Sequence, residues 1–464
     1  MMLSAYFLFF LFVVLFELRR NKSVFVDFMT LFNLFFVFGY LMPAIIFLLN
    51  PQYSYKWRFL AVVPETMESF TVLLAIAVGY LSIVVGYLAG ASQKISVYPL
   101  TVFKYGEKTQ FIMVVFFFAI SLVSFMVYVY GHGGIIELLL SGKDIRAGRE
   151  SAGVYQYFRC LSSGMLLSML LFYSFKKNSS KVFYRRISGY FLGLSFLLSL
   201  ISAIGTAGRG KIGMVFLVLL FFGLNCDSVK ITVKKVSILL LCSVLVFLLV
   251  KYGKSAIWTL GSLEKGISAY VSAFDAHCER YMGDTKGEDA MMVLVGFAKH
   301  VDHGIASVYL SLFKPEIYQF PRLFFDWFRA ILDVIPGVYQ PEFIVSNTPA
   351  GLNRDFFHVG GYVPPGWVAM KIINGGFVWL LIGSLIAGFI GGYLNKFLIL
   401  SWESSPIVPA LFIYLAFFWK DSIVGPDPFM VVLPNLSTFL FFCLLVGMLK
   451  IKINRLPNVT PHFS

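Results

Sequence analysis

The sequence predicts an all-α polytopic integral membrane protein with about 11 transmembrane helices. The chain has 464 residues, of which 58% are hydrophobic and only 13% are charged. Soluble proteins carry about a quarter charged residues, so a water-soluble fold is excluded. The mean hydropathy is +0.80, and apolar runs of the length that crosses the hydrocarbon core recur along the whole chain.

Each of these apolar runs is expected to form one membrane-spanning helix. The first run lacks the basic region and the small-residue cleavage site of a signal peptide, so it is expected to remain in the protein. A stretch at 291–313 has charged and histidine residues in its middle, and it is expected to stay on the outer side. The expected spans are 3–18, 28–49, 70–88, 111–130, 154–175, 189–207, 212–224, 236–252, 375–394, 407–419 and 430–449.

The distribution of Lys and Arg predicts the orientation of these spans. If the N-terminus lies outside, every loop on the inner side carries Lys or Arg, and so does the C-terminal segment. Because positive residues resist translocation, the N-terminus is expected outside and the C-terminus in the cytoplasm. The net charge of +14 is then almost wholly a topology signal, and no nucleic-acid partner is expected.

This topology divides the chain into three parts. Residues 1–252 hold transmembrane helices 1–8 with short loops, 253–373 form one large outer loop, and 374–464 hold helices 9–11 and the cytoplasmic C-terminus. Aromatic and aliphatic residues recur in the large loop, which therefore is expected to contain amphipathic helices. In one of these, Arg322, Asp326, Arg329 and Asp333 form a single helical stripe, expected to face water while the apolar faces lie in the membrane interface.

Several classes of function are excluded by missing motifs. The sequence has no phosphate-binding loop of the Gly-x-x-x-x-Gly-Lys type, no dinucleotide fingerprint, no Gly-x-Ser-x-Gly elbow and no Asp-x-Asp pair. The spans lack the ladder of Asp and Glu that proton-coupled transporters use. The scattered cysteines, which lack disulfide or metal-site spacing, are interpreted as structural. They are Cys160, Cys226, Cys242, Cys278 and Cys443.

Arginines at the outer face are the first candidates for ligand binding. Arg146 and Arg149 lie in SGKDIRAGRES after the fourth span, and Arg159 lies inside the apolar zone of the fifth. Arg209 lies among three glycines in GTAGRGK, where the sixth span ends. Guanidinium groups bind phosphate oxygens in a bidentate manner, so these residues indicate an anionic ligand. The alternative is that they anchor the chain to lipid headgroups or snorkel to the membrane surface.

The large loop supplies candidates for acid–base chemistry and further cations. Glu279, His300, Asp302, His303 and His358 are each able to accept a proton from a sugar hydroxyl. No metal ligand is predicted, since no histidine or cysteine spacing typical of zinc is present. Further cationic candidates in the loop are Arg280, Arg329 and Arg354, for which a self-paired, solvated ion pair is the alternative interpretation.

At three places the sequence resembles the Wzy-type O-antigen and oligosaccharide repeat unit polymerases of bacterial inner membranes. The resemblance lies in GTAGRGK at 205–211, in IPG at 335–337 and in GGYVPPGWVAMKIINGG at 360–376, together with the long outer loop between two late spans. The resemblance implies a metal-independent, GT-C-like glycosyltransferase without a cofactor. It would join undecaprenyl-pyrophosphate-linked glycans at the periplasmic face, in lipopolysaccharide biosynthesis.

The resemblance also implies which residues act. Arg209 matches the Gly-Arg-Gly turn of the family, and Arg146, Arg149 and Arg280 lie in equivalent loops; all four are expected to be catalytic, with Asp302 and His303. Arg159, His300, Arg329, Arg354 and His358 are expected to bind substrate. Membrane lipids are expected partners, and whether a chain-length regulator protein binds stays open. An O-antigen ligase that transfers glycan to lipid A-core, or a flippase for lipid-linked oligosaccharides, is the alternative.

Overall fold

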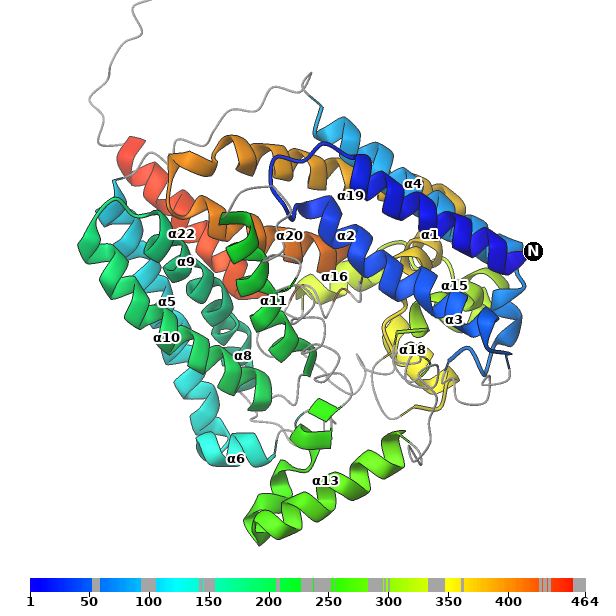
Figure 1. The fold of residues 1–464 in the computed structure, drawn as a ribbon, viewed down its shortest axis with the longest axis horizontal. Coiled ribbons are helices and arrows are strands. Elements are labelled where there is room, and N and C mark those ends of the chain that lie inside the picture. The colour runs from blue at the N-terminus through cyan, green and yellow to red at the C-terminus, as the bar shows by residue number, and fades with distance from the viewer. Residues whose placement is uncertain are drawn as a thin grey trace, which may run out of the picture.

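The fold is a bundle of helices, seen in a computed structural model (Figure 1). No strand occurs among the residues that the structure describes. These are 1–51, 59–92, 106–141, 155–205, 209–226, 252–253, 255–282, 301–332, 347–359, 363–424 and 435–453, with the single positions 145, 237, 295, 298, 428 and 432.

The chain begins with two apolar crossings. Helix α1 (Met2–Arg19) is followed by α2 (Phe28–Phe36), a π-helical turn η1 (Val37–Leu41) and α3 (Met42–Leu49). Asp27 starts α2, since its carboxylate accepts a hydrogen bond from the Thr30 amide at 2.8 Å. Only Tyr6 and Val13 of α1 are buried, so α1 lies on the outside of the bundle.

Two parallel helices pack closely against each other, α4 (Phe70–Gly90) and α19 (Gly366–Leu400). Each carries a Gly-x-x-x-Gly pair, Gly86 and Gly90 on α4 and Gly388 and Gly392 on α19. A Cβ built on Gly388 would lie 2.2 Å from the Ile83 carbonyl oxygen, and one on Gly86 would lie 2.1 Å from that of Leu385. The two backbones therefore touch, which is possible because all four residues lack a side chain.

Helix α19 is broken near its start. Gly376 has φ 68° and ψ −158°, a conformation that is essentially restricted to glycine. Lys371 and Gly383 are about 18 Å apart in a straight helix, yet a Cβ built on Gly383 would lie 3.2 Å from the Lys371 side chain. The short arm before the break therefore folds back against the long arm after it.

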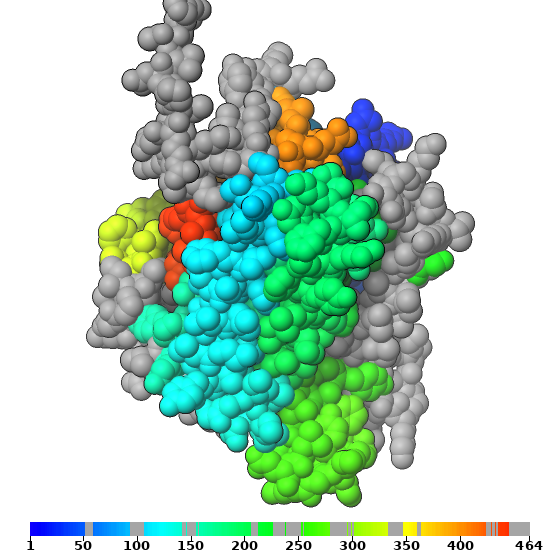
Figure 2. Space-filling view, turned by 90° about the vertical axis from the view of Figure 1, so that its left-hand side faces the viewer, coloured from blue at the N-terminus to red at the C-terminus, as the bar shows by residue number. Residues whose placement is uncertain are grey.

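A second group of helices lies beside the helices described above. It contains α5 (Glu107–Gly131), α8 (Gln156–Ser162), α9 (Gly164–Asn178), α10 (Val182–Gly205) and α11 (Arg209–Cys226). Phe172 of α9 lies between Phe118 of α5 and Phe191 of α10, with ring centroids 5.5 and 4.9 Å away. Figure 2 shows α5 and α10 running side by side on this face. Helices α20 (Val408–Val424) and α22 (Leu436–Ile453) complete the bundle.

The segment between α11 and α19 contributes short helices. They are η6 (Leu260–Lys265), α13 (Ile267–Met282), α15 (His303–Phe313), η7 (Pro315–Tyr318), α16 (Phe325–Leu332) and α18 (Pro349–Phe356). Helix α15 is buried along most of its length, and it packs against α4, α19 and η1. Smaller elements elsewhere are η3 (Pro64–Met67), α6 (Ile135–Leu140) and η8 (Trp402–Ser404).

The structure confirms a helical membrane protein. Seven helices within the described residues are long and apolar enough to cross a membrane. The expected span 212–224 forms a shorter apolar helix, and most of 236–252 lies outside the described residues. The expected start of the ninth span at Gly375 coincides with the break in α19, after which the long arm begins. The short arm, from Gly366 to the break, is an additional helical segment that the expected spans do not include.

The two ends of the bundle can be told apart by their contacts. At one end, which we call the Asp27 end, Val26 bonds Asn225 and Lys396 bonds the Ser92 carbonyl at 2.8 Å. Glu107 and Ser179 also meet there, at 2.8 Å. The loops that meet at the Asp27 end are those that the distribution of Lys and Arg predicts on the inner side of the membrane. The opposite end, where α4 begins and α15 and α18 gather, is called the Phe59 end.

Candidate functional site

Four of the predicted site residues lie at the Phe59 end, namely Asp302, His303, Arg354 and His358. Asp302 and His303 contact Phe59, which also contacts Phe357, and we call these four contacting residues the Phe59 cluster. The Phe59 ring lies 5.9 Å from the His303 ring and 5.0 Å from the Phe357 ring. Asp302 and His303 start α15, while Arg354 and His358 lie at the end of α18, beside Phe357. Phe59 thus joins two helices that are far apart along the chain.

Asp302 is fully buried in this cluster. Its Oδ2 atom accepts hydrogen bonds from the backbone amides of Phe59 and Leu60, at 3.2 and 3.1 Å. A carboxylate oxygen that accepts two backbone amides holds its side chain in one orientation. This geometry favours a positioning role for Asp302, which holds the 59–60 segment beside His303.

Helix α18 is anchored by buried polar contacts. The Thr348 hydroxyl caps its first turn by accepting from the Gly351 amide at 3.0 Å. The Asn353 amide group donates to Ser307 at 2.9 Å, and its oxygen accepts from the Tyr318 hydroxyl. Burial raises the pKa of Tyr318 above its ordinary range, although the bonds to Ser307 and Asn353 act to lower it. The sequence reasoning missed Tyr318 and Asn353, which have no recognisable spacing.

Arg354 and His358 are on the more open side of α18. Arg354 pairs with the adjacent Asp355 at 2.7 Å, and its side chain is 26% exposed. His358 is exposed and has φ 50°, so it ends the helix in a left-handed conformation. Both side chains are therefore within reach of a ligand at the Phe59 end.

The charged stripe of α16 does not face water, and that expectation is wrong. Arg322 and Asp326 are buried and paired, with Nε–Oδ2 and Nη2–Oδ1 distances of 2.6 Å. Arg322 also donates to the carbonyls of Tyr318 at 3.2 Å and Asn347 at 2.8 Å. Arg329 is half-buried, and Asp333 lies outside the described residues. The Arg322–Asp326 half of the stripe is an internal anchor, whereas Phe325, Phe328, Ile331 and Leu332 of α16 are exposed.

The other predicted arginines are placed only in part. Arg159 lies in the last turn of α8 and is half-buried. Arg209 begins α11 and Arg280 lies in α13, but their side chains lie outside the described part of the chain. Arg146, Arg149 and His300 also lie outside it. The structure therefore connects the start of α15, with Asp302 and His303, to the end of α18, with Arg354 and His358, through the contacts of Phe59 with His303 and Phe357.

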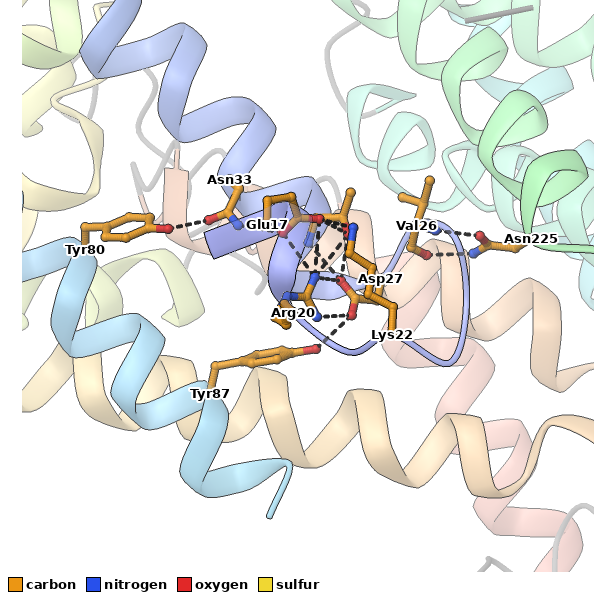
Figure 3. A network of polar contacts seen from close by, with 10 residues as sticks. Glu17, Arg20, Lys22, Val26, Asp27, Asn33, Tyr80, Tyr87 and Asn225 are labelled. Carbon is orange, nitrogen blue, oxygen red and sulfur yellow. Dashed lines mark hydrogen bonds and ion pairs between the residues drawn. The ribbon is translucent and has the colours of Figure 1, made fainter. Parts of the chain in front are cut away.

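A second polar cluster, at the Asp27 end, was missed by the sequence reasoning (Figure 3). Arg20 donates to both oxygens of Asp27, at 2.7 Å for the Nη2–Oδ1 contact, and to Glu17 at 3.2 Å. Tyr87 of α4 donates to Asp27 at 3.4 Å. The sequence does contain a signal for part of this cluster, because Asp27 directly precedes an apolar run and is therefore a recognisable helix N-cap. Arg20, taken as a topology charge, is 7% exposed at its side chain and serves as a structural counter-ion.

The pKa of Asp27 is set by this cluster. Burial alone would raise the pKa of Asp27, but the hydrogen bonds and charge of Arg20, together with the Thr30 contacts, hold it below its ordinary value. Burial would lower the pKa of Arg20, but its bonds to Asp27 and the nearby carboxylates raise it. Both groups therefore stay charged in the folded protein.

Within the described ranges, no group of three or more His, Cys, Asp or Glu side chains is placed to hold a metal ion. The Phe59 end instead offers imidazole and guanidinium groups at the end of an apolar bundle, an arrangement that suits an amphiphilic anion. Comparisons of the chain with protein-family models, with curated proteins and with solved structures find no match.

Proposed function

We propose that the protein is a polymerase of undecaprenyl-pyrophosphate-linked oligosaccharide repeat units, similar to the Wzy-type polymerases, with its site at the Phe59 end facing the periplasm. The observation that carries this proposal is the contact of Phe59 with His303 at the start of α15 and with Phe357 at the end of α18, where Arg354 and His358 also lie, at the end of a bundle of membrane helices. The loops of the Asp27 end carry the excess of Lys and Arg, which supports placing that end in the cytoplasm.

The proposed reaction transfers the growing glycan to a new repeat unit. The acceptor hydroxyl oxygen forms a bond to the anomeric carbon of the donor sugar, and the bond from that carbon to the pyrophosphate oxygen breaks. The hydroxyl proton passes to a base, and undecaprenyl pyrophosphate leaves as an anion. This chemistry needs a proton acceptor near the sugars and cations near the pyrophosphate.

The described residues suit these needs in different ways. His303 and His358 are the proposed proton acceptors, because each carries an imidazole at the Phe59 end and Asp302 is occupied by two amides. Arg354, which is partly exposed, is a proposed cation for the pyrophosphate. From the resemblance, Arg209 is the strongest further candidate, with Arg146, Arg149, Arg159 and Arg280 as additional cations. The prenyl chain would lie among the apolar helices.

Deletion of the gene, followed by gel analysis of lipopolysaccharide, tests the proposal. A polymerase defect leaves lipid A-core with a single repeat unit. Core with no repeat unit would instead indicate a ligase or a flippase, and an unchanged ladder would reject all three functions.

Complementation of the deletion strain tests the arginine that the resemblance singles out. Arg209→Ala is expected to abolish the ladder while the protein still inserts in the membrane. Arg185→Ala, an exposed arginine that starts α10 at the Asp27 end, is the matched control and is expected to restore the ladder. A normal ladder with Arg209→Ala would remove Arg209 from the site.

A further inference from the structure

We propose that residues 319–332 form a re-entrant segment, in which α16 lies within the hydrocarbon of the bilayer and presents its apolar face to lipid acyl chains. The inference stands on the polarity of α16, on its depth in the bundle and on its continuity with the exposed face of α19. It is independent of the reaction that the protein catalyses.

The polarity of α16 is the reverse of that of a helix in water. Asp326 and Ala330 lie on one face and are 1% and 0% exposed, whereas Phe328 is 69% exposed. The other exposed apolar side chains of the segment are Leu323, Phe324, Phe325, Ile331 and Leu332. In water such a surface would carry a large cost, but in lipid the apolar face is the one that belongs outside.

The segment reaches about halfway into the bundle. Leu380 and Trp367 both lie against Gly79, which is near the middle of the membrane-crossing helix α4. The Phe324 ring contacts the ring of Trp379, the neighbour of Leu380, at 4.6 Å. Phe324, directly before α16, is therefore near the middle of the bilayer.

The backbone of the segment is satisfied by the break in α19. The Arg322 amide donates to the Ile373 carbonyl at 3.2 Å, and the Phe324 amide donates to the Asn374 side-chain oxygen at 2.8 Å. Non-helical backbone is tolerated at membrane depth only where protein covers its polar groups. The two irregular segments meet this condition by bonding to each other.

The apolar face of α16 continues onto a lipid-facing surface. Next to Trp379, the exposed residues of α19 include Val378, which is 69% exposed, together with Phe377, Leu381 and Ile382. These residues belong to a helix that crosses the membrane, so their surroundings are acyl chains. Since Phe324 touches Trp379, the same lipid layer extends over α16.

Depth measurement with spin labels tests this proposal in the full-length protein, reconstituted in phosphatidylcholine vesicles after its native cysteines are replaced by serine. A label at Phe328→Cys is expected to collide with oxygen and to be shielded from a water-soluble nickel chelate, as a label at Val378→Cys would be. Glu316→Cys, an exposed position of η7 in the same loop, is the aqueous control. Ala330→Cys is expected to be shielded from both reagents.

Two results would overturn the proposal. If the label at Phe328→Cys meets the nickel chelate as often as the one at Glu316→Cys, α16 lies in water. If it is shielded from both reagents, protein covers the face, as in contact with a second copy of the chain. Should Phe328→Cys fail to fold, Ile331→Cys on the same exposed face gives the same discrimination.

Discussion

Arg322 and Asp326 form a bidentate ion pair that is buried between the start of α16 and the break in α19, with both nitrogen–oxygen distances at 2.6 Å. Because both side chains are buried, water cannot solvate the charge of one residue if the other is removed. Removal of one partner from such a pair leaves an uncompensated charge, which costs about 3–5 kcal/mol.

Arg322→Ala and Asp326→Ala are therefore each expected to lower the free energy of unfolding by about 3–5 kcal/mol. The double variant Arg322→Met, Asp326→Leu is expected to lose less than either single variant, because it leaves no unpaired charge. Unfolding of the protein in detergent measures these differences, with the half-buried Arg329→Ala as the control on the same helix. Single and double variants of equal stability would contradict the interpretation.

Gly388→Ala is expected to destabilise the protein by about 1–3 kcal/mol, the usual cost of overpacking. Its Cβ would lie 2.2 Å from a backbone oxygen of α4, which has little freedom to move. Gly193→Ala in α10 is the matched control, since nothing lies within 4 Å of its Cβ position. The control is expected to be neutral or slightly stabilising. The thermal unfolding midpoints of Gly388→Ala and Gly193→Ala measure this difference. Equal midpoints would refute close packing at Gly388.

The stability of the protein is expected to fall when Asp27 becomes protonated. The pKa of Asp27 is lowered in the folded state, so its ion pair contributes fully above the ordinary carboxyl pKa of about 3.9. Below that pH the unfolded chain takes up the proton first, and the free energy of unfolding decreases until folded Asp27 is itself protonated.

Unfolding midpoints between pH 7 and pH 3 measure this dependence. Asp27→Asn is expected to be less stable than the wild type at pH 7 and to show a weaker decrease toward acid. Glu65→Gln, which changes an exposed acid of η3, should follow the wild type. A wild-type slope in Asp27→Asn would show that other groups control acid unfolding.

The geometry of Asp302 predicts that its conservative variant stays active. Asp302→Asn retains an oxygen acceptor for the Phe59 and Leu60 amides, so most of the proposed polymerase activity is expected to remain, whereas Asp302→Ala releases that segment. His303→Gln, if His303 accepts the proton, is expected to lower kcat by about 100-fold or more. It should also flatten the pH profile of kcat. If Asp302→Asn is as inactive as His303→Gln, Asp302 is itself the base.

Much of the helical architecture could be predicted from apolar runs, because membrane helices need uninterrupted apolar sequence. The start expected at Gly375 coincides with the break in α19. The short arm before it was not expected, because Lys371 and Asn374 interrupt its apolar sequence. Periodicity correctly placed Arg322 and Asp326 on one face of a helix. It could not tell which face is covered, since an amphipathic pattern has the opposite meaning when the surrounding solvent is lipid.

The site was less predictable than the fold. The contact of Phe59 with His303 joins positions that are far apart along the chain, and no local spacing encodes such a contact. Arg20 was interpreted from its charge alone, although its partner Asp27 lies seven positions later across an irregular turn. In contrast, the Gly-x-x-x-Gly pairs of α4 and α19 are visible in the sequence and indicate close helix contact.

The close contact of α4 with α19 determines which parts of the bundle can move relative to one another. With their backbones touching at Gly86 and Gly388, a sliding motion of one helix along the other would drive Cα atoms into carbonyl oxygens. The pair must therefore move as one rigid body. Any opening of the bundle has to come from displacement of other elements relative to this body. Candidates are α1, which buries few of its residues, and the short arm of α19, which is joined to the long arm through Gly376.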